Sequence, residues 1–148
     1  WLKQKTYIDE KRIGIWGWSY GGYFTTYALT TTKLFKMGIA VAPVTDWRHY
    51  DTIYTERFMN TPQNNPLGYQ KSSAVRNASN LHGKFLLIHG TMDDNVHLQN
   101  SVQLIYALQR AGKQFDFMIY PKCCHSIKIP ILRYHLYKTM TDYVLKNL

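Results

Sequence analysis

A serine flanked by glycines is the first residue of this chain whose surroundings could support chemistry. Ser19 lies in the run Gly17-Trp18-Ser19-Tyr20-Gly21-Gly22, behind an apolar run and ahead of a helical stretch. Glycines two positions before and after a serine, at a strand-to-helix turn, are typical of the nucleophile of serine hydrolases. In so tight a turn, we expect a Cβ at Gly17 or Gly21 to clash with the neighbouring strand and helix. A glycine-rich turn with a helix-capping serine would show the same residues, so the motif alone leaves both interpretations open.

An acid and a base follow Ser19 in the order that hydrolytic chemistry requires. Asp93 and His125 each come shortly after an apolar run. In α/β-hydrolases the serine, acid and histidine follow one another in this order, and ligands bind at the carboxyl ends of the strands. His125 would take the Ser19 proton and return it to a leaving amine, while Asp93 would orient the imidazole and stabilise its cation. The backbone N–H of Tyr20 would supply one oxyanion-hole donor.

Neighbouring residues could fill the same roles, and simpler explanations exist. Either Asp93 or Asp94 could cap the helix that begins near residue 97. We assign the acid to Asp93, and a cap or structural role to Asp94. His125 could be a surface histidine, but the others are placed less well. His89 ends a buried strand, where a core histidine with satisfied hydrogen bonds is expected, and His135 falls inside the final helix.

The elements that must position these residues alternate between strands and helices. Apolar runs indicate strands covered on both faces, and apolar residues at helical spacing follow them. This alternation predicts parallel βαβ units. We therefore expect an α/β fold: the C-terminal portion of an α/β-hydrolase fold, with a mostly parallel sheet and helices on both faces. The predicted strands are residues 12–16, 37–42, 85–90 and 115–120, and the predicted helices are residues 20–31, 97–111 and a last one from Pro130.

Two segments of this pattern carry further expectations. Between residues 47 and 78 we expect a helical excursion that is polar, aromatic and irregular, as an inserted pocket-forming segment would be. The last helix carries an apolar residue every four positions, and this stripe could cover the sheet or face a partner subunit. The stripe consists of Leu132, Leu136, Met140, Val144 and Leu148.

Composition argues against several classes of function. With 148 residues, 45% of them hydrophobic, the chain is long enough for one core. No apolar run reaches 18 residues, so we expect no membrane contact from this segment. The net charge of +9 comes from 18 scattered Lys and Arg, a pattern that does not favour nucleic-acid binding. Cys123 and Cys124 are adjacent, which makes a disulfide strained, and no side chains have metal-site spacing, so we expect neither metal nor cofactor.

Four longer motifs contain or flank the candidate triad. They are Gly17-Trp18-Ser19-Tyr20-Gly21-Gly22, Val41-Ala42-Pro43-Val44, Tyr50-Asp51-Thr52-Ile53-Tyr54-Thr55-Glu56-Arg57 and His89-Gly90-Thr91-Met92-Asp93-Asp94-Asn95-Val96-His97. Together they resemble the dipeptidyl peptidase IV branch of the prolyl oligopeptidase family, over nearly the whole chain. The tryptophan before the serine and the Tyr-Thr-Glu-Arg block separate this branch from esterases and lipases.

The resemblance implies a serine exopeptidase that removes dipeptides from peptide N-termini when the second residue is proline or alanine. By position, Ser19, Asp93 and His125 match the triad. Aromatic faces and small aliphatic edges would suit a flat, apolar proline ring, although ordinary loop packing would also explain the tyrosines. The matching pocket residues are Tyr50 and Tyr54 as walls, Val44, Trp47 and Val96 as lining, and Asn95 as a ligand of the substrate carbonyl one residue upstream.

Two departures from the family pattern matter. Cys124 and Ser126 replace a polar residue before the histidine and a frequent glycine after it, and the next residues are not small and polar, so the loop could hold His125 differently. The family also carries a β-propeller and early sheet strands ahead of this region. We expect residues 1–148 to be a partial catalytic domain that lacks them. Because the second oxyanion donor would lie upstream, we expect the chain alone to be weakly active, since losing one donor costs about 100–1000-fold.

The resemblance also suggests where and how the parent protein acts. It implies peptide substrates, a homodimer, and a secreted, periplasmic or membrane-anchored protein with its catalytic domain outside the cytoplasm. Two alternatives remain: an acylaminoacyl peptidase or esterase with the same triad, and a non-catalytic hydrolase-like module for binding or dimerisation. The Tyr50 and Tyr54 pair argues against the first, and the presence of Ser19 argues against the second.

Overall fold

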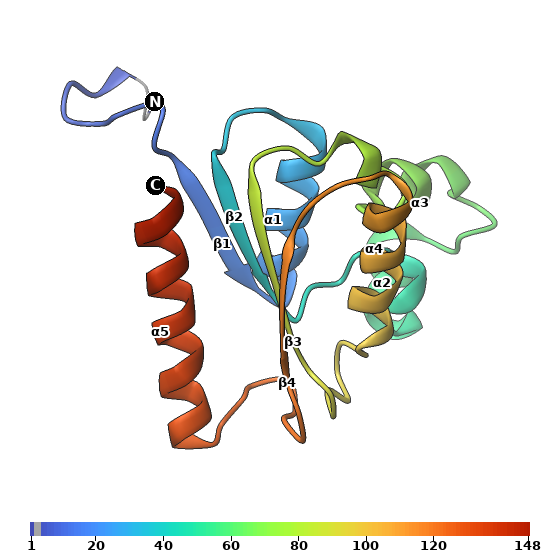
Figure 1. The fold of residues 1–148 in the computed structure, drawn as a ribbon. Coiled ribbons are helices and arrows are strands. Elements are labelled where there is room, and N and C mark those ends of the chain that lie inside the picture. Colours follow the sequence, from blue (N-terminus) through green and yellow to red (C-terminus); the bar gives the residue numbers. More distant parts are fainter. Residues whose placement is uncertain (2–3) are drawn as a thin grey trace.

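Four parallel strands form the centre of this computed structural model, which describes residue 1 and residues 4–148 (Figure 1). They lie side by side in sequence order: β1 (Gly14–Trp18), β2 (Met37–Val41), β3 (Lys84–Gly90) and β4 (Asp116–Tyr120). In the parallel register Trp18 pairs with Val41, Val41 with Ile88, and Gly90 with Tyr120. The carboxyl ends of all four strands therefore meet at one edge, where open parallel sheets bind their ligands.

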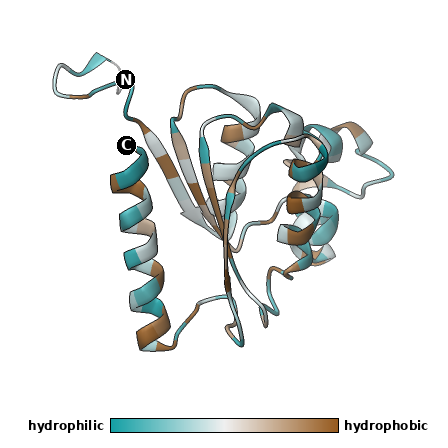
Figure 2. Cartoon of the chain, viewed as in Figure 1, coloured by the Kyte–Doolittle hydropathy of each residue, from teal (hydrophilic) through white to brown (hydrophobic). Residues whose placement is uncertain are grey.

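Helices cover both faces of the sheet, because alternate strand residues point to opposite sides. Ile39 and Ile88 pack in one core with α5 (Pro130–Asn147), whereas Leu87 packs in a second core with α1 (Tyr20–Thr31) and α4 (Gln99–Arg110). Figure 1 shows α5 on the left of the sheet and α1 and α4 on the right. Hydrophobic residues concentrate on the strands between these layers (Figure 2). The expected α/β fold is confirmed.

The apolar stripe of α5 covers the sheet. Leu136 and Met140 are buried in the core that contains Ile39, and Leu132, Val144 and Leu148 pack around them. The opposite side of α5 exposes Ile131, Tyr134 and Leu145. Among the described residues, no helix combines the length and the apolar character needed to cross a membrane.

The segment between β2 and β3 is more regular than expected. It forms two short 3₁₀ helices, η2 (Trp47–His49) and η3 (Ala78–Asn80), and two α-helices, α2 (Thr52–Met59) and α3 (Pro66–Ser72). Side-chain caps start the α-helices: Asp51 accepts the Tyr54 N–H, and Asn65 accepts the Gly68 N–H. Both helices are short, and their local sequence signals are the two caps and Pro66 in the first turn of α3.

Two predicted elements begin two residues too early. The first strand is Gly14–Trp18, not residues 12–16, so it continues to the residue before Ser19. Helix α4 begins at Gln99, with Leu98 at the N-cap position and no capping side chain. The helix-capping function proposed for Asp94 is therefore wrong, because the turn before α4 places that residue away from the helix start.

Candidate active site

Ser19 occupies the turn between β1 and α1 in a strained backbone conformation. Its φ of 59° lies in a region that residues other than glycine rarely adopt. Its N–H donates to the Val41 carbonyl at 2.8 Å, and its carbonyl accepts the Tyr23 N–H at 2.9 Å, so both sides of the turn are fixed. The side chain makes no capping hydrogen bond with α1. This geometry contradicts the helix-capping interpretation and is typical of a nucleophile elbow.

Glycine is required beside Ser19 at Gly17 and Gly22. A Cβ on Gly17 would lie 2.3 Å from the backbone carbonyl of Gly21, which no real structure tolerates. At Gly21 a Cβ would meet nothing within 4 Å among the described residues outside its own helix, so the clash expected there is wrong. A Cβ on Gly22 would instead approach the Val41 carbonyl to 2.9 Å. Helix α1 therefore lies close to both β1 and the end of β2.

Asp93 and His125 are in direct contact. Nδ1 of His125 lies 2.7 Å from Oδ2 of Asp93, and the other oxygen, Oδ1, accepts the N–H groups of Asn95 at 3.0 Å and Val96 at 2.9 Å. Burial raises the pKa of Asp93, but hydrogen bonds from His125 and His89 and the charge of His125 outweigh it and hold that pKa well below the usual carboxyl range. Asp93 is therefore ionised at neutral pH, as an acid that orients an imidazole must be.

Backbone contacts join the two loops that carry this pair. The Thr91 N–H donates to the Tyr120 carbonyl, and the Met92 N–H donates to the Cys123 carbonyl, both at 3.0 Å. A Cβ on Gly90 would lie 2.3 Å from the Cys123 carbonyl oxygen, so glycine is needed for this approach. The loops after β3 and β4 thus form one unit, which sets the distance between the acid and the base.

The unusual loop around His125 presents the imidazole to Asp93. The Trp18 Nε1–H donates to the His125 carbonyl at 2.9 Å, which ties the loop to the residue before Ser19. Ile127 is buried, with a φ of 43° that is rare for a β-branched residue. Among the described residues, the Ser19 hydroxyl makes no hydrogen bond with His125 or with any other group. Such bonds are often long until a substrate binds.

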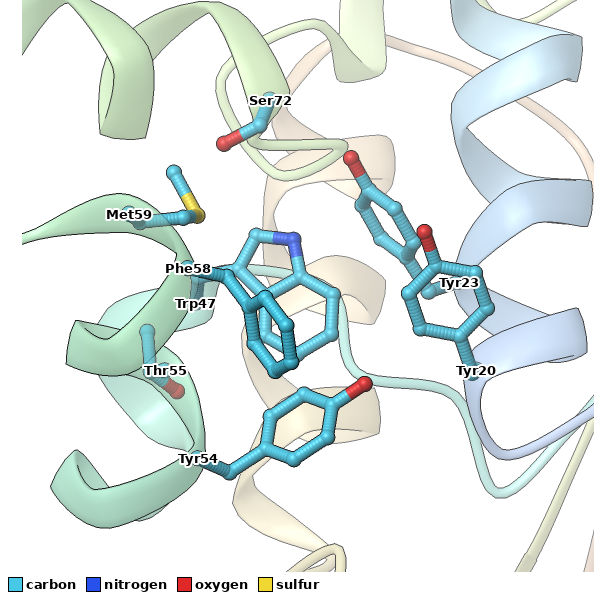
Figure 3. Close-up of a pocket in the computed structure, with 8 residues that line it drawn as sticks. All are labelled: Tyr20, Tyr23, Trp47, Tyr54, Thr55, Phe58, Met59 and Ser72. Carbon is cyan, nitrogen blue, oxygen red and sulfur yellow. The ribbon is translucent and has the colours of Figure 1, made fainter.

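Aromatic rings next to Ser19 enclose a cavity of about 350 Å³ (Figure 3). The Trp47 and Tyr54 rings are stacked, with centroids 6.0 Å apart and 26° between their planes, and the Tyr20 ring lies 5.9 Å from Trp47. Figure 3 shows Tyr20 and Tyr23 on the α1 side and the α2 residues opposite them. The cavity is lined by Tyr20, Tyr23, Trp47, Tyr54, Thr55, Phe58, Met59 and Ser72.

The predicted pocket residues gather here but do not all line the cavity. Trp47 and Tyr54 do. Tyr50 lies beside them, 5.4 Å from Tyr54 edge to face, and its hydroxyl donates to Oδ1 of Asn95 at 2.9 Å. Two further predicted residues, Val44 and Val96, are buried behind the cavity in the apolar cluster of Trp47.

Comparisons with known proteins agree with this geometry. The profile of the prolyl oligopeptidase family matches residues 1–148. The chain belongs to the prolyl oligopeptidase family. It is 56% identical over 129 residues to a probable dipeptidyl-aminopeptidase B of Neurospora crassa, an alignment that covers 84% of this chain and 14% of that relative. The crystal structure of Porphyromonas gingivalis dipeptidyl peptidase 4 matches with a TM-score of 0.97 and 51% identity, over 99% of this chain and 21% of that one.

A second solved structure supports the same branch of the prolyl oligopeptidase family. A putative dipeptidyl aminopeptidase IV from Bacteroides ovatus matches with a TM-score of 0.95 and 38% identity, again over 99% of this chain and 21% of that one. The resemblance to the dipeptidyl peptidase IV branch is therefore confirmed. The chain spans about one seventh to one fifth of the length of these relatives.

Sequence reasoning missed five residues of the pocket in this family member. Phe58 follows Tyr54 by four positions on α2, and Tyr23 follows Tyr20 by three on α1, so helical spacing could have placed them on the same face. Ser72 had no such signal, because α3 is brought to the cavity only by the fold, and Thr55 and Met59 are further residues of α2. The missed residues are Tyr23, Thr55, Phe58, Met59 and Ser72.

Proposed function

We propose that this chain supplies the triad and the specificity pocket of a serine exopeptidase. The enzyme would release dipeptides whose second residue is proline or alanine from peptide N-termini. The observation that carries the proposal is the 2.7 Å contact between Asp93 and His125, formed at the strand edge where Ser19 occupies its strained turn. The names of the relatives, which are dipeptidyl peptidases and aminopeptidases, support the reaction class.

Each triad residue has a defined task. Nε2 of His125 takes the proton of the Ser19 hydroxyl as its oxygen attacks the carbonyl carbon of the scissile bond. The N–H of Tyr20 lies at the start of α1, where backbone donors lack helical partners, and donates to the oxyanion. His125 then passes the proton to the leaving amine, and water releases the dipeptide by the reverse sequence. Asp93 keeps the Nδ1 proton in place throughout.

The aromatic cavity supplies the selectivity. A proline ring is flat and apolar, and it suits the aromatic faces that line this cavity, among them those of Trp47 and Tyr54. Tyr50 and Asn95 stand beside this cavity, and we assign them to the substrate main chain, with the Asn95 amide facing the carbonyl one residue upstream. The buried Val44 and Val96 hold the aromatic residues in place.

Membership of the same family suggests the substrates, oligomeric state and location of the enzyme. We propose peptide substrates, a homodimeric complete gene product and an extracytoplasmic location. The exposed Ile131, Tyr134 and Leu145 on α5 are apolar surface that a partner subunit could cover.

Hydrolysis of Gly-Pro-p-nitroanilide by the complete gene product tests the proposal, because the matched relatives are several times longer than this chain. We expect cleavage that the Ser19→Ala variant lacks, and a much smaller rate with a short-chain p-nitrophenyl ester. Preference for the ester would favour an esterase. A folded protein that cleaves neither substrate would favour a non-catalytic binding module.

A further inference from the structure

A second histidine contacts the carboxylate of Asp93. His89, near the end of β3, has its Nε2 3.3 Å from Oδ2 of Asp93 and 2.8 Å from the Val96 carbonyl oxygen. Its Nδ1 lies 2.7 Å from the hydroxyl of Ser101 in α4. The side chain has no exposed surface. It is thus a core histidine with satisfied hydrogen bonds, as expected, but one of its partners is the triad acid.

These contacts determine where the His89 proton lies. The Val96 carbonyl can only accept, and so can the ionised carboxylate of Asp93, so Nε2 must carry the hydrogen. The Ser101 hydroxyl can donate to Nδ1, so the tautomer with its hydrogen on Nε2 has partners for both ring nitrogens. The Nε2–H therefore has two acceptors within reach, the Val96 carbonyl oxygen at 2.8 Å and Oδ2 of Asp93 at 3.3 Å.

Oδ2 of Asp93 also accepts the hydrogen bond from His125, the proposed catalytic base. Oδ2 of Asp93 faces Nε2 of His89 on one side and Nδ1 of His125 on the other. The opposite oxygen, Oδ1, accepts the Val96 N–H, while the Val96 carbonyl accepts from His89. Val96 and His89 thus surround the carboxylate, through the hydrogen bonds of Val96 to Oδ1 and to His89 and the 3.3 Å contact of His89 with Oδ2. His89, Asp93 and Val96 are buried, whereas the side chain of His125 is partly exposed.

We propose that His89 is a positioning residue for the peptidase reaction. Its Nε2–H holds Oδ2 of Asp93 where that oxygen accepts from Nδ1 of His125, and Ser101 holds His89 in the tautomer that this requires. The inference rests on the proposed function, because it assigns the supporting layer of the proposed triad. His89 itself does not touch the substrate.

Substitutions at His89 in the complete gene product test this, with Gly-Pro-p-nitroanilide as substrate. His89→Leu removes the donor, and we expect kcat to fall about 10–100-fold, the range for losing a hydrogen bond to a charged group. KM should stay within about twofold, because His89 does not line the cavity. His89→Gln keeps an N–H donor and should recover part of kcat. Equal losses in the two variants would contradict the positioning role.

A double-mutant cycle separates positioning from general stability. If His89 acts through Asp93, His89→Leu should change kcat by a factor near one when Asp93→Ala is already present. The same 10–100-fold loss in both backgrounds would overturn the proposal. If His89→Leu does not fold, Ser101→Ala takes its place in the cycle, with a severalfold loss expected only when Asp93 is intact. An Asp93→Ala variant as active as the wild type would instead refute the proposed function itself.

Discussion

Asp93→Asn replaces one carboxylate oxygen by an NH₂ group, and the structure predicts that this moves the proton of His125 from Nδ1 to Nε2. Oδ1 of Asp93 accepts two backbone N–H groups, from Asn95 and Val96. The oxygen of an asparagine must stay on that side, so its NH₂ group faces Nδ1 of His125 across the 2.7 Å contact. Two donors cannot meet there. His125 must then carry its proton on Nε2, where it cannot accept the proton of Ser19.

The expected loss follows from the change of tautomer. In serine peptidases with this triad, the same substitution lowers kcat about 10⁴-fold, which corresponds to about 5 kcal/mol of transition-state stabilisation. KM should change less than about threefold, because Asp93 does not line the aromatic cavity. The assay is the release of p-nitroaniline from Gly-Pro-p-nitroanilide by the complete gene product, with a thermal melt to show that the variant is folded.

The adjacent carboxylate provides a matched control. Asp94 is exposed, in contrast to the buried Asp93, and Asp94→Asn should keep kcat within about twofold of the wild type. An Asp93→Asn variant that keeps more than a tenth of the wild-type kcat would refute the assignment of the acid. A larger loss in Asp94→Asn would transfer that assignment to Asp94.

Three further predictions concern the pocket, the loop and pH. Tyr54→Ala removes one ring of the stack with Trp47, so kcat/KM for a Gly-Pro substrate should fall about 10–100-fold. Tyr54→Phe keeps the ring, and its kcat/KM should stay within about threefold of the wild type in the same steady-state assay. Equal losses in the two variants would show that the Tyr54 ring face does not bind the proline ring. Trp18→Phe removes the donor to the His125 carbonyl, and kcat should fall about three- to tenfold at unchanged KM; a wild-type kcat would show that the loop needs no such anchor. Because folding lowers the pKa of Asp93, the stability it contributes is fully present above about pH 4 and is lost as the pH falls further. Urea unfolding at pH 6 and pH 3 should therefore show a difference between wild type and Asp93→Asn that shrinks at the lower pH, and a constant difference would contradict the low pKa.

Much of the fold could be predicted because its signals are local. The apolar runs that became β2 and β3 are continuous, and the parallel arrangement follows from the helices between them. The boundaries of β1 and α4 were less accurate, because strand ends and caps depend on tertiary contacts. The helices between β2 and β3 are short, and the sequence offered only brief signals of them, such as the caps Asp51 and Asn65 and the proline that follows Asn65.

The candidate site shows a similar division. The order of Ser19, Asp93 and His125 placed each on a loop at one edge of the sheet, because parallel strands end at the same edge. Contacts that join distant segments could not be predicted, and the bond from Trp18 to the His125 carbonyl is one of them. The contact of His89 with Asp93 is another, since a buried histidine at a strand end gives no indication of its partner.

Covalent labelling of Ser19 tests the assignment of the nucleophile most directly. A fluorophosphonate reacts with a serine hydroxyl that a neighbouring base activates, and mass spectrometry of the labelled peptides identifies the modified residue. With the complete gene product, we predict an adduct on Ser19, no labelling of Ser19→Ala, and much slower labelling of Asp93→Asn. A folded wild-type protein that is not labelled, or that carries the adduct on a different serine, would contradict the account.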